Sequence, residues 1–276
     1  MKKVFVIAAA AMMLAACQKE EVSTTKTISL NASMEQMSGD SKTTFGTDGL
    51  SIVWEEGDEI LVIDQNGKEA RLQATKGGSE TTFTGEVGDD FESIKYAFYP
   101  ASIFSNYRKT VNTYIDFTLD QNRPCSVDAL ASGANPSWAT VEEGATYATF
   151  NNLCGILKIT VDVQSAGLTS LILKDNNYAI SGKMTLTLSG VHAGDVARPG
   201  TGSRYATISN DSELTTGEHE FYFVAPEGAF NKGAMVYANT YVGETSYVYT
   251  TRDNSLSKST IKVMPELKWL GGNLYN

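Results

Sequence analysis

The feature that most constrains the fold of this chain is a side-chain alternation of period two, which recurs from Ile28 onward. It is clearest in residues 157–163, 115–119 and 184–188, where apolar and polar residues take turns. Such alternation is typical of β-strands with one buried face. No amphipathic helix longer than two turns is indicated, so the chain is predicted to be all-β. Shorter strands are expected at residues 52–54, 60–63, 96–99, 171–173, 221–224, 235–241, 247–250 and 261–264.

Turn residues support this interpretation. The Asn66-Gly67 pair tolerates the positive φ values of a two-residue hairpin turn, so residues 60–63 and 70–73 are expected to pair. Many short strands with frequent turns predict stacked antiparallel sheets, which form a β-sandwich. This many strands would overfill one sandwich, so we expect two β-sandwich domains in tandem. The boundary is expected in the polar stretch 132–144, which gives an N-terminal domain at 28–144 and a C-terminal domain at 145–276.

The first segment indicates export and lipid attachment. Lys2 and Lys3 precede an apolar run that is too short to span a membrane. The run ends at Leu14-Ala15-Ala16-Cys17, which resembles the bacterial lipoprotein box that is cut before its cysteine. We therefore expect a lipoprotein signal peptide at residues 1–16, a lipid on Cys17 that enters the outer membrane, and a polar tether at residues 17–27. An ordinary signal peptide with an incidental cysteine is the alternative.

The charge of the chain argues against nucleic acid as a partner. The 276 residues include 32 acidic and 22 basic ones, which gives a net charge of −10 and a pI near 4.8. An acidic chain without a basic patch repels nucleic acid and anionic lipid surfaces. The segment Gln18-Lys19-Glu20-Glu21 resembles the acidic signal that directs lipoproteins of Bacteroides-type bacteria to the cell exterior. A solvated tether is the other interpretation of this segment.

Few residues indicate chemistry, and no enzyme activity, metal or cofactor is expected. His192 and His219 lie in polar contexts without partners at metal-ligand spacing, so both are expected at the surface. The acidic cluster 55–59 is expected to decorate a turn between two strands. Calcium binding by this cluster or by residues 89–92, and a glycosidase-type carboxylate pair, are the less favoured alternatives. Cys125 and Cys154 leave two interpretations open, a disulfide or small buried apolar residues.

Aromatic residues offer a further functional surface. Exposed Trp and Tyr rings stack on sugars and suit protein interfaces, but a β-sandwich core uses the same residues. Trp54 and Trp138 are expected in the core, whereas the position of Trp269 is open.

Several short motifs resemble one known family. The chain contains Thr43-Thr44-Phe45, a W-x-x-G-D-x-I pattern that begins at Trp54, Phe83-Thr84-Gly85, and Tyr96-Ala97-Phe98-Tyr99-Pro100. Together these segments resemble the N-terminal domain of fimbrillin-like surface lipoproteins of Bacteroides-type bacteria. Residues 150–159 and 221–226 similarly resemble parts of the second domain of such proteins.

The resemblance implies two transthyretin-like β-sandwich domains and a non-enzymatic role in fimbria assembly, fimbria anchoring or cell adhesion. It also implies β-strand complementation between subunits, in which a strand of one subunit completes the sheet of another. The candidate donated or closing strand here carries Ile261 and Val263.

The partners implied by the resemblance are other fimbrial subunits and a host or microbial surface glycan or protein. Lys26, Lys42 and Arg71 are the early basic residues at which such subunits would be processed, but none lies in an obvious processing motif. Shaft, tip, anchor and stand-alone roles therefore stay open. The alternative function is a glycan-binding surface lipoprotein that uses exposed aromatic residues.

Overall fold

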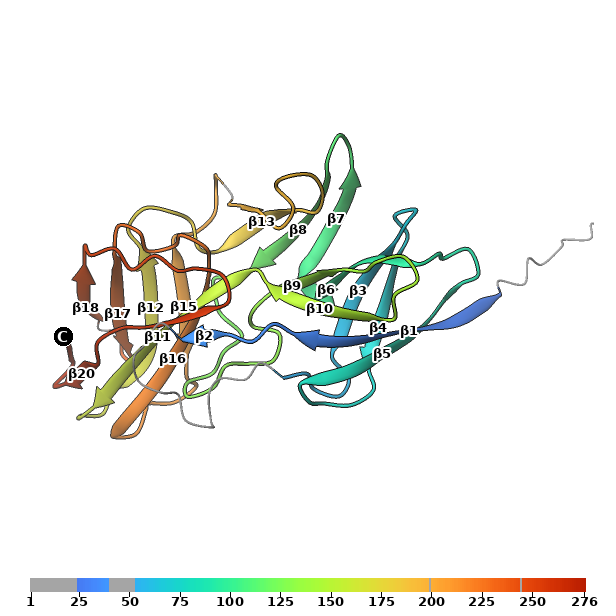
Figure 1. The fold of residues 1–276 in the computed structure, drawn as a ribbon. Helices are drawn as coiled ribbons and strands as arrows, with labels where there is room; N and C mark the ends of the chain where they lie inside the picture. Colours follow the sequence, from blue (N-terminus) through green and yellow to red (C-terminus); the bar gives the residue numbers. More distant parts are fainter. Residues whose placement is uncertain (1–23, 40–52, 199, 244) are drawn as a thin grey trace, which may run out of the picture.

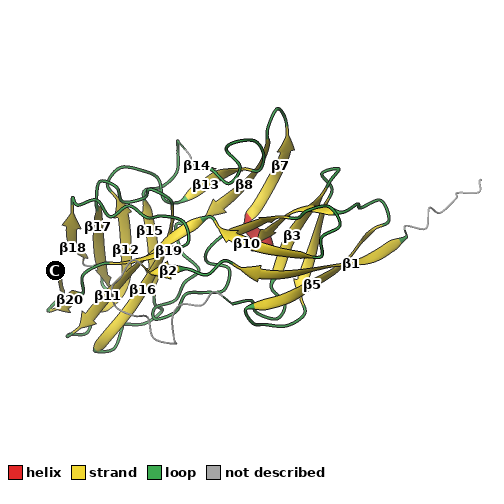
Figure 2. Ribbon diagram, viewed as in Figure 1, coloured by secondary structure: helices red, strands yellow, loops and turns green. Residues whose placement is uncertain are grey.

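The structure is a computed structural model that describes residues 24–39, 53–198, 200–243 and 245–276. Within these residues the chain forms β-strands and one short 3-10 helix, η1 (Ala101–Ile103), which Figure 2 shows in red beside β3 and β10. The strands form two lobes of sheet (Figure 1). The prediction of an all-β protein built from β-sandwich layers is confirmed. Cys17 and the signal peptide lie outside the described residues, as do the motif Thr43-Thr44-Phe45 and Lys42.

The first lobe is a sheet that closes on itself. Its strands are joined in the order β1-β10-β9-β6-β3-β4-β5, so the barrel closes where β5 pairs with β1. Trp54 fills its centre and is 1% exposed. The Trp54 ring meets Phe83, Tyr99 and Phe150 edge to face at 4.9, 4.8 and 5.3 Å between ring centroids. The strands are β1 (Thr25–Met34), β3 (Glu59–Asp64), β4 (Glu69–Ala74), β5 (Glu80–Gly88), β6 (Ile94–Tyr99), β9 (Ser137–Thr140) and β10 (Tyr147–Asn152).

The second lobe is a sandwich of two sheets. The first sheet has the order β2-β19-β11-β20-β21, and β16 pairs with the other side of β11. Its strands are β2 (Ser38–Gly39), β11 (Cys154–Val163), β16 (Gly217–Pro226), β19 (Thr260–Val263), β20 (Leu267–Leu270) and β21 (Asn273–Tyr275). The facing sheet has the order β15-β12-β17-β18 and contains β12 (Leu168–Asp175), β15 (Tyr205–Ser209), β17 (Ala234–Thr240) and β18 (Thr245–Thr250). Their inner faces share a core that includes Ile159, Leu171, Phe223, Val236 and Trp269.

A third, smaller sheet joins the lobes. It has the order β14-β13-β8-β7 and contains β7 (Phe104–Lys109), β8 (Thr113–Leu119), β13 (Gly182–Thr187) and β14 (Val196–Ala197). Phe104 lies between Phe98 of the barrel wall and Phe117 of this sheet, with ring centroids 5.1 and 5.5 Å away. These residues belong to the same buried cluster as the sandwich core. One continuous apolar cluster therefore connects the outer wall of the barrel to the second lobe.

The predicted pairing of residues 60–63 with 70–73 is confirmed, but the turn is not the expected two-residue type, because Asn66 does not have a positive φ. Strands β3 and β4 pair in antiparallel register from Glu59↔Gln73 to Ile63↔Glu69, and Gly67 has a φ of 90°. The Asp64 carboxylate accepts hydrogen bonds from the backbone N of Asn66 and Lys68, both at 2.8 Å. A turn residue with positive φ and an Asp that binds its own loop together fix this connection.

The division at residue 144 stays a prediction, and strand pairing crosses it. Strand β10 lies after this position but pairs with β1 and β9 in the barrel, and β8 lies before it but pairs with β13. Only Leu153 separates β10 from β11, so the chain runs almost directly from one lobe into the other (Figure 1). One assignment is corrected: residues 25–27, which we expected in the tether, begin β1. Their polar side chains are exposed, and backbone pairing to β5 holds them in the sheet.

Candidate strand-exchange site

Strand β1 fills a slot between two other strands of the barrel. It pairs with β5 in antiparallel register from Thr25↔Gly88 to Ser33↔Glu80, and with β10 in parallel register from Asn31↔Tyr147 to Met34↔Phe150. Alternate side chains point inward, and Leu30, Ala32 and Met34 are 1%, 0% and 5% exposed. The slot therefore accepts an extended segment whose inward positions are apolar, and loss of β1 would leave unpaired edges on both β5 and β10.

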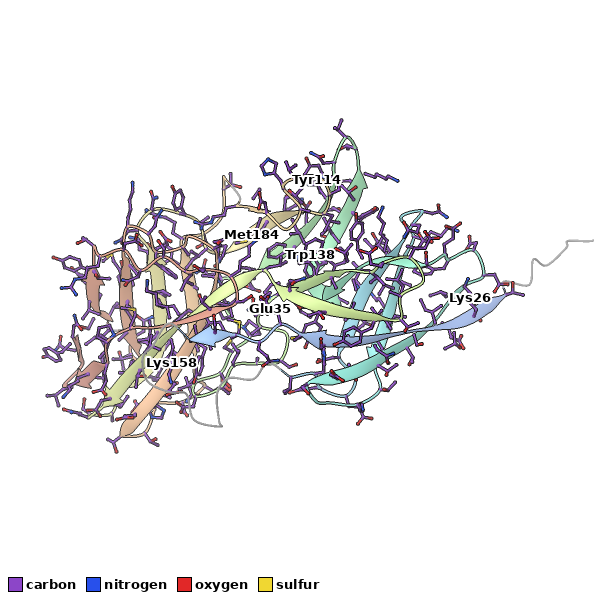
Figure 3. All side chains as sticks on the ribbon, viewed as in Figure 1. Lys26, Glu35, Tyr114, Trp138, Lys158 and Met184 are labelled. Carbon is purple, nitrogen blue, oxygen red and sulfur yellow. The ribbon has the colours of Figure 1, made fainter. Side chains whose placement is uncertain are left out.

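The segment after β1 carries the chain into the second lobe. The Glu35 backbone N donates to the carbonyl O of Phe150 at 2.8 Å. The Glu35 carboxylate accepts hydrogen bonds from the backbone N of Asn152 at 3.1 Å and from Ser259 Oγ at 2.5 Å. Figure 3 shows Glu35 between the lobes. Residues 25–39 thus complete the barrel and also contact the C-terminal strands.

Ile261 and Val263, the candidate donated or closing strand, lie in β19 of this chain's own sandwich. Strand β19 pairs in parallel with β11 at Ile156↔Ile261 and Lys158↔Val263, and β2 pairs with its other side at Ile261↔Gly39. Ile261 is 3% exposed and Val263 is 38% exposed. The first and last described segments of the chain are therefore neighbours in one sheet, and donation of β19 to another subunit stays a prediction.

The basic residues considered for processing have different surroundings. Lys26 lies in β1, and its Nζ donates to the backbone carbonyl of Asp89 at 3.3 Å. Arg71 lies in β4, where its guanidinium binds the Glu59 carboxylate.

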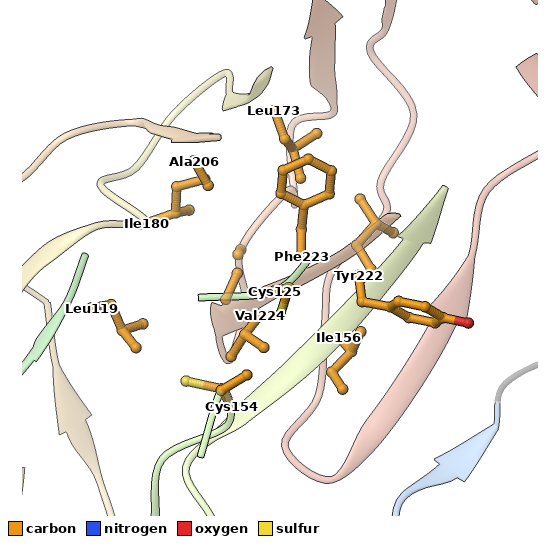
Figure 4. Close-up of a cluster of buried hydrophobic side chains, with 14 of the residues drawn as sticks. Leu119, Cys125, Cys154, Ile156, Leu173, Ile180, Ala206, Tyr222, Phe223 and Val224 are labelled. Carbon is orange, nitrogen blue, oxygen red and sulfur yellow. The ribbon is translucent and has the colours of Figure 1, made fainter. Parts of the chain in front are cut away.

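The two cysteines are free thiols in the described structure, and both are buried. Figure 4 shows them in the apolar cluster with Ile156 and Phe223. Burial raises the pKa of the Cys125 thiol and raises that of Cys154 to about 12. The sequence left open a disulfide or two small buried apolar residues. The structure agrees with the second interpretation, because no disulfide joins Cys125 to Cys154.

Each histidine pairs with one aspartate. His192 Nδ1 is 3.0 Å from Asp195 Oδ2 at the surface. His219 Nδ1 is 2.7 Å from Asp128 Oδ2, and its Nε2 is 2.9 Å from the Thr215 carbonyl O. Burial lowers the pKa of His219, but these two hydrogen bonds outweigh burial and the net shift is upward. No group of three or more His, Cys, Asp or Glu side chains suited to a metal occurs in the described parts of the chain.

The acidic clusters stabilise turns. The Asp58 carboxylate accepts a hydrogen bond from the Glu55 backbone N at 2.8 Å, which closes the turn after Trp54. Asp90 forms an ion pair with Lys68 in the neighbouring loop. The first cluster thus has the turn role that the sequence favoured, and its last residue, Glu59, begins β3.

Sequence reasoning missed the burial of charged residues, of which Asp116 and Arg123 are two examples. Asp116 is 3% exposed and lies 2.9 Å from Arg108 Nη1 and 2.8 Å from Lys183 Nζ. Burial alone would raise the pKa of Asp116, but hydrogen bonds from Lys183, Thr185 and Arg108 lower it. Arg123 is 6% exposed and binds backbone carbonyls. Asp116 occupies a polar position in a strand that looked half-exposed, so the sequence carried no signal for its burial.

The aromatic residues divide between core and surface. Trp54, Trp138 and Trp269 are 1%, 8% and 0% exposed, so none of them offers a sugar-stacking platform. The exposed aromatic rings among the described residues are tyrosines, which are Tyr147, Tyr178, Tyr241, Tyr247, Tyr249 and Tyr275. Among the residues described, no helix has the length and apolar character needed to cross a bilayer.

Comparison with known proteins identifies the fold. No protein-family model matches the chain, and no curated protein sequence matches it. One solved structure is described as a "putative cell adhesion protein" from Bacteroides uniformis. The match covers 90% of this chain and 94% of that chain, with 14% identity and a TM-score of 0.51. A second protein with this description comes from Bacteroides ovatus. The match covers 91% of this chain and 95% of that chain, with 11% identity and a TM-score of 0.57.

A looser likeness extends to the tip fimbrial protein Mfa3 of Porphyromonas gingivalis. The match covers 91% of this chain and 97% of that chain, with 11% identity and a TM-score of 0.37. The first two matches cover nearly the whole length of both chains. This chain therefore shares its fold with two Bacteroides proteins that are each described as a "putative cell adhesion protein".

Proposed function

We propose that this chain is a non-enzymatic cell-surface protein of the fimbrillin-like type, which acts in adhesion or in fimbria assembly or anchoring through exchange of β-strands. The observation that carries the proposal is the position of β1, which completes the barrel by pairing with β5 and β10. A strand from another subunit with the same apolar alternation would make the same backbone hydrogen bonds and fill the same inward positions. The fold shared with proteins described as adhesion proteins supports this role.

The proposal includes attachment to the outer membrane through a lipid on Cys17. The start of β1 lies at the end of the molecule opposite β18 and β20 (Figure 1). A protein anchored upstream of β1 would therefore present the far end of the second lobe away from the membrane. Multiple acyl chains on one cysteine would give firm attachment, because each buried methylene contributes about 0.8 kcal/mol.

Strand exchange is tested by cutting the chain between β1–β2 and the rest. A site for a sequence-specific protease is inserted between residues 45 and 46, and the cut protein is mixed with labelled peptides of residues 24–39. We expect the peptide to replace the native segment, as measured by fluorescence anisotropy. A Leu30→Asp peptide should bind about 100-fold more weakly or worse, since its charge enters the barrel core at a position that is 1% exposed.

The matched control is a Ser29→Asp peptide, which adds the same charge at the neighbouring exposed position. It should exchange as well as the native peptide. Equal exchange of both variants, or no release of the native segment from the cut protein, would contradict strand complementation at this slot. Multimers that resist detergent should form once the free segment is removed, and persistent monomers would count against assembly by this route.

Lipid attachment is tested separately. The change Cys17→Ser should abolish fatty-acid labelling in a Bacteroides-type host and move the protein from the membrane fraction to the soluble fraction. Cys125→Ser is the control, because Cys125 is a buried thiol that should not affect labelling. Retained label on the Cys17→Ser protein would refute the lipoprotein assignment.

A further inference from the structure

The outer face of the β15-β12-β17-β18 sheet is rich in tyrosine. Residues directly opposite in neighbouring strands share a face of the sheet, and the register links Tyr205 to Lys174, Ile172 to Tyr237, and Tyr237 to Tyr247. We call this surface the tyrosine face and define it by Tyr205, Thr207, Ser209, Ser170, Ile172, Lys174, Met235, Tyr237, Asn239, Thr245, Tyr247 and Tyr249.

The aromatic rings of the tyrosine face form a connected row. The centroids of Tyr205 and Tyr237 are 6.5 Å apart, and those of Tyr237 and Tyr247 are 5.7 Å apart. Exposure increases along the row toward the sheet edge, where Tyr247 and Tyr249 are 55% and 69% exposed. Contact between neighbouring rings restricts the orientation of Tyr205, Tyr237 and Tyr247 before any ligand arrives, which lowers the entropic cost of binding.

Lys174 is the one charged residue among the members of the tyrosine face. Its Nζ lies 5.4 Å from the centre of the Tyr205 ring, where the charge is partly shielded. One residue in five of the whole chain is charged, so a solvent-facing sheet surface of this size would ordinarily carry several charges. The other members combine aromatic rings and two aliphatic side chains with hydroxyl and amide groups. This composition is amphipathic and nearly neutral.

The tyrosine face lies at the end of the molecule opposite the start of β1. Figure 1 places β17 and β18 at that far end. The turn between these strands adds two exposed side chains, Tyr241 and Val242, each 78% exposed. A cavity of about 520 Å³ lies mainly on the opposite, inner side of the same hairpin, where Val236, Val248 and Leu267 line it, and it meets the tyrosine face at Tyr249.

We propose that the tyrosine face binds a neutral glycan chain, and this inference rests on the proposed adhesive function. Sugar rings present apolar C–H groups on their faces and hydroxyls at their edges. Tyrosine rings would cover the C–H groups, while Thr, Ser and Asn side chains exchange hydrogen bonds with the hydroxyls. A surface with a single charged side chain, Lys174, suits an uncharged ligand because few charged groups have to lose water. A flat sheet face suits an extended chain rather than an enclosed monosaccharide.

The test uses the mature chain carrying Cys17→Ser, purified in soluble form. It is titrated with neutral oligosaccharides of β-linked glucose, mannose, xylose and N-acetylglucosamine, and with oligogalacturonate and sialylated oligosaccharides as acidic probes. Binding is measured by isothermal titration calorimetry and affinity electrophoresis. We expect at least one neutral oligosaccharide to bind, and Tyr237→Ala and Tyr247→Ala each to weaken that binding about fivefold to tenfold.

Tyr275→Ala is the matched control, because Tyr275 is a 50% exposed tyrosine in the other sheet of the sandwich. It should leave binding unchanged, and all three variants should keep the unfolding midpoint of the parent protein within a few degrees. Binding should also be insensitive to salt, because no ion pair is formed.

Three results would overturn the proposal. They are failure of every neutral oligosaccharide to bind, binding of the acidic probes alone, and an equal effect of Tyr275→Ala. A dimer detected by light scattering that Tyr247→Ala dissociates would overturn it as well, and would assign the tyrosine face to contact with a second copy. These outcomes are independent of strand exchange, since the soluble chain is uncut and the peptide experiment leaves the tyrosine face unchanged.

Discussion

Replacing Trp54 by alanine is expected to lower the free energy of unfolding by about 4 kcal/mol. Trp54 is 1% exposed and contacts three aromatic rings within the barrel. The wall around it is closed by continuous strand pairing, so it cannot easily collapse into the cavity that the substitution leaves. The change is measured by urea denaturation followed by far-ultraviolet circular dichroism.

Trp54→Phe is the matched control for this prediction. It keeps an aromatic ring in the core and removes the indole Nε1, which is buried and has no hydrogen-bond partner in the described structure. We expect the free energy of unfolding to fall by about 1 to 2 kcal/mol. Phenylalanine leaves a smaller cavity than alanine does, and removal of the unsatisfied Nε1 donor offsets part of the cavity cost. If Trp54→Ala cost no more than Trp54→Phe, the ring packing would not be the main contribution of this residue to the barrel.

The strands with the clearest alternation could be predicted from the sequence. Residues 157–163, 115–119 and 184–188 fall in β11, β8 and β13, with ends that differ by a few residues. Strand β1 carries the same signal at Ile28, Leu30, Ala32 and Met34 but is otherwise polar. The alternation is visible from Ile28 onward, but residues 25–27 are polar and resemble a tether, so the sequence did not place the start of this strand.

Pairing between strands could not be predicted in the same way. Alternation shows that one face of a strand is buried, but it does not show which sheet the strand joins. Nothing in residues 147–152 indicates that β10 pairs in parallel with β1, so barrel closure became visible only in the structure. The tyrosine face is hidden from the sequence for the same reason, because Tyr205, Tyr237 and Tyr247 become neighbours only through strand register.

Arg123 illustrates a buried group that no sequence pattern marked. Its Nε donates to the Val224 carbonyl O at 3.0 Å, its Nη2 to the Ile180 carbonyl O at 2.7 Å, and its Nη1 to Ser181 Oγ at 3.2 Å. Its Nη1 also donates to the carbonyl O of Asp120. Burial lowers the pKa of the guanidinium to about 10, and no carboxylate forms an ion pair with it among the described residues. The Arg123 side chain therefore connects its own segment, at Asp120, with the segments at residues 180–181 and at Val224.

Replacing Arg123 by methionine is expected to lower the free energy of unfolding by about 3 kcal/mol. Methionine fills most of the volume but leaves the Val224 and Ile180 carbonyl groups without their donor. Arg123→Lys should not restore stability, because one ammonium group lacks the planar fork that reaches three segments. Arg71→Met is the control, since Arg71 is half-exposed and its surface ion pair with Glu59 is worth less than about 1 kcal/mol. Equal losses in Arg123→Met and Arg71→Met, measured by urea denaturation, would show that the buried guanidinium does not hold these segments together.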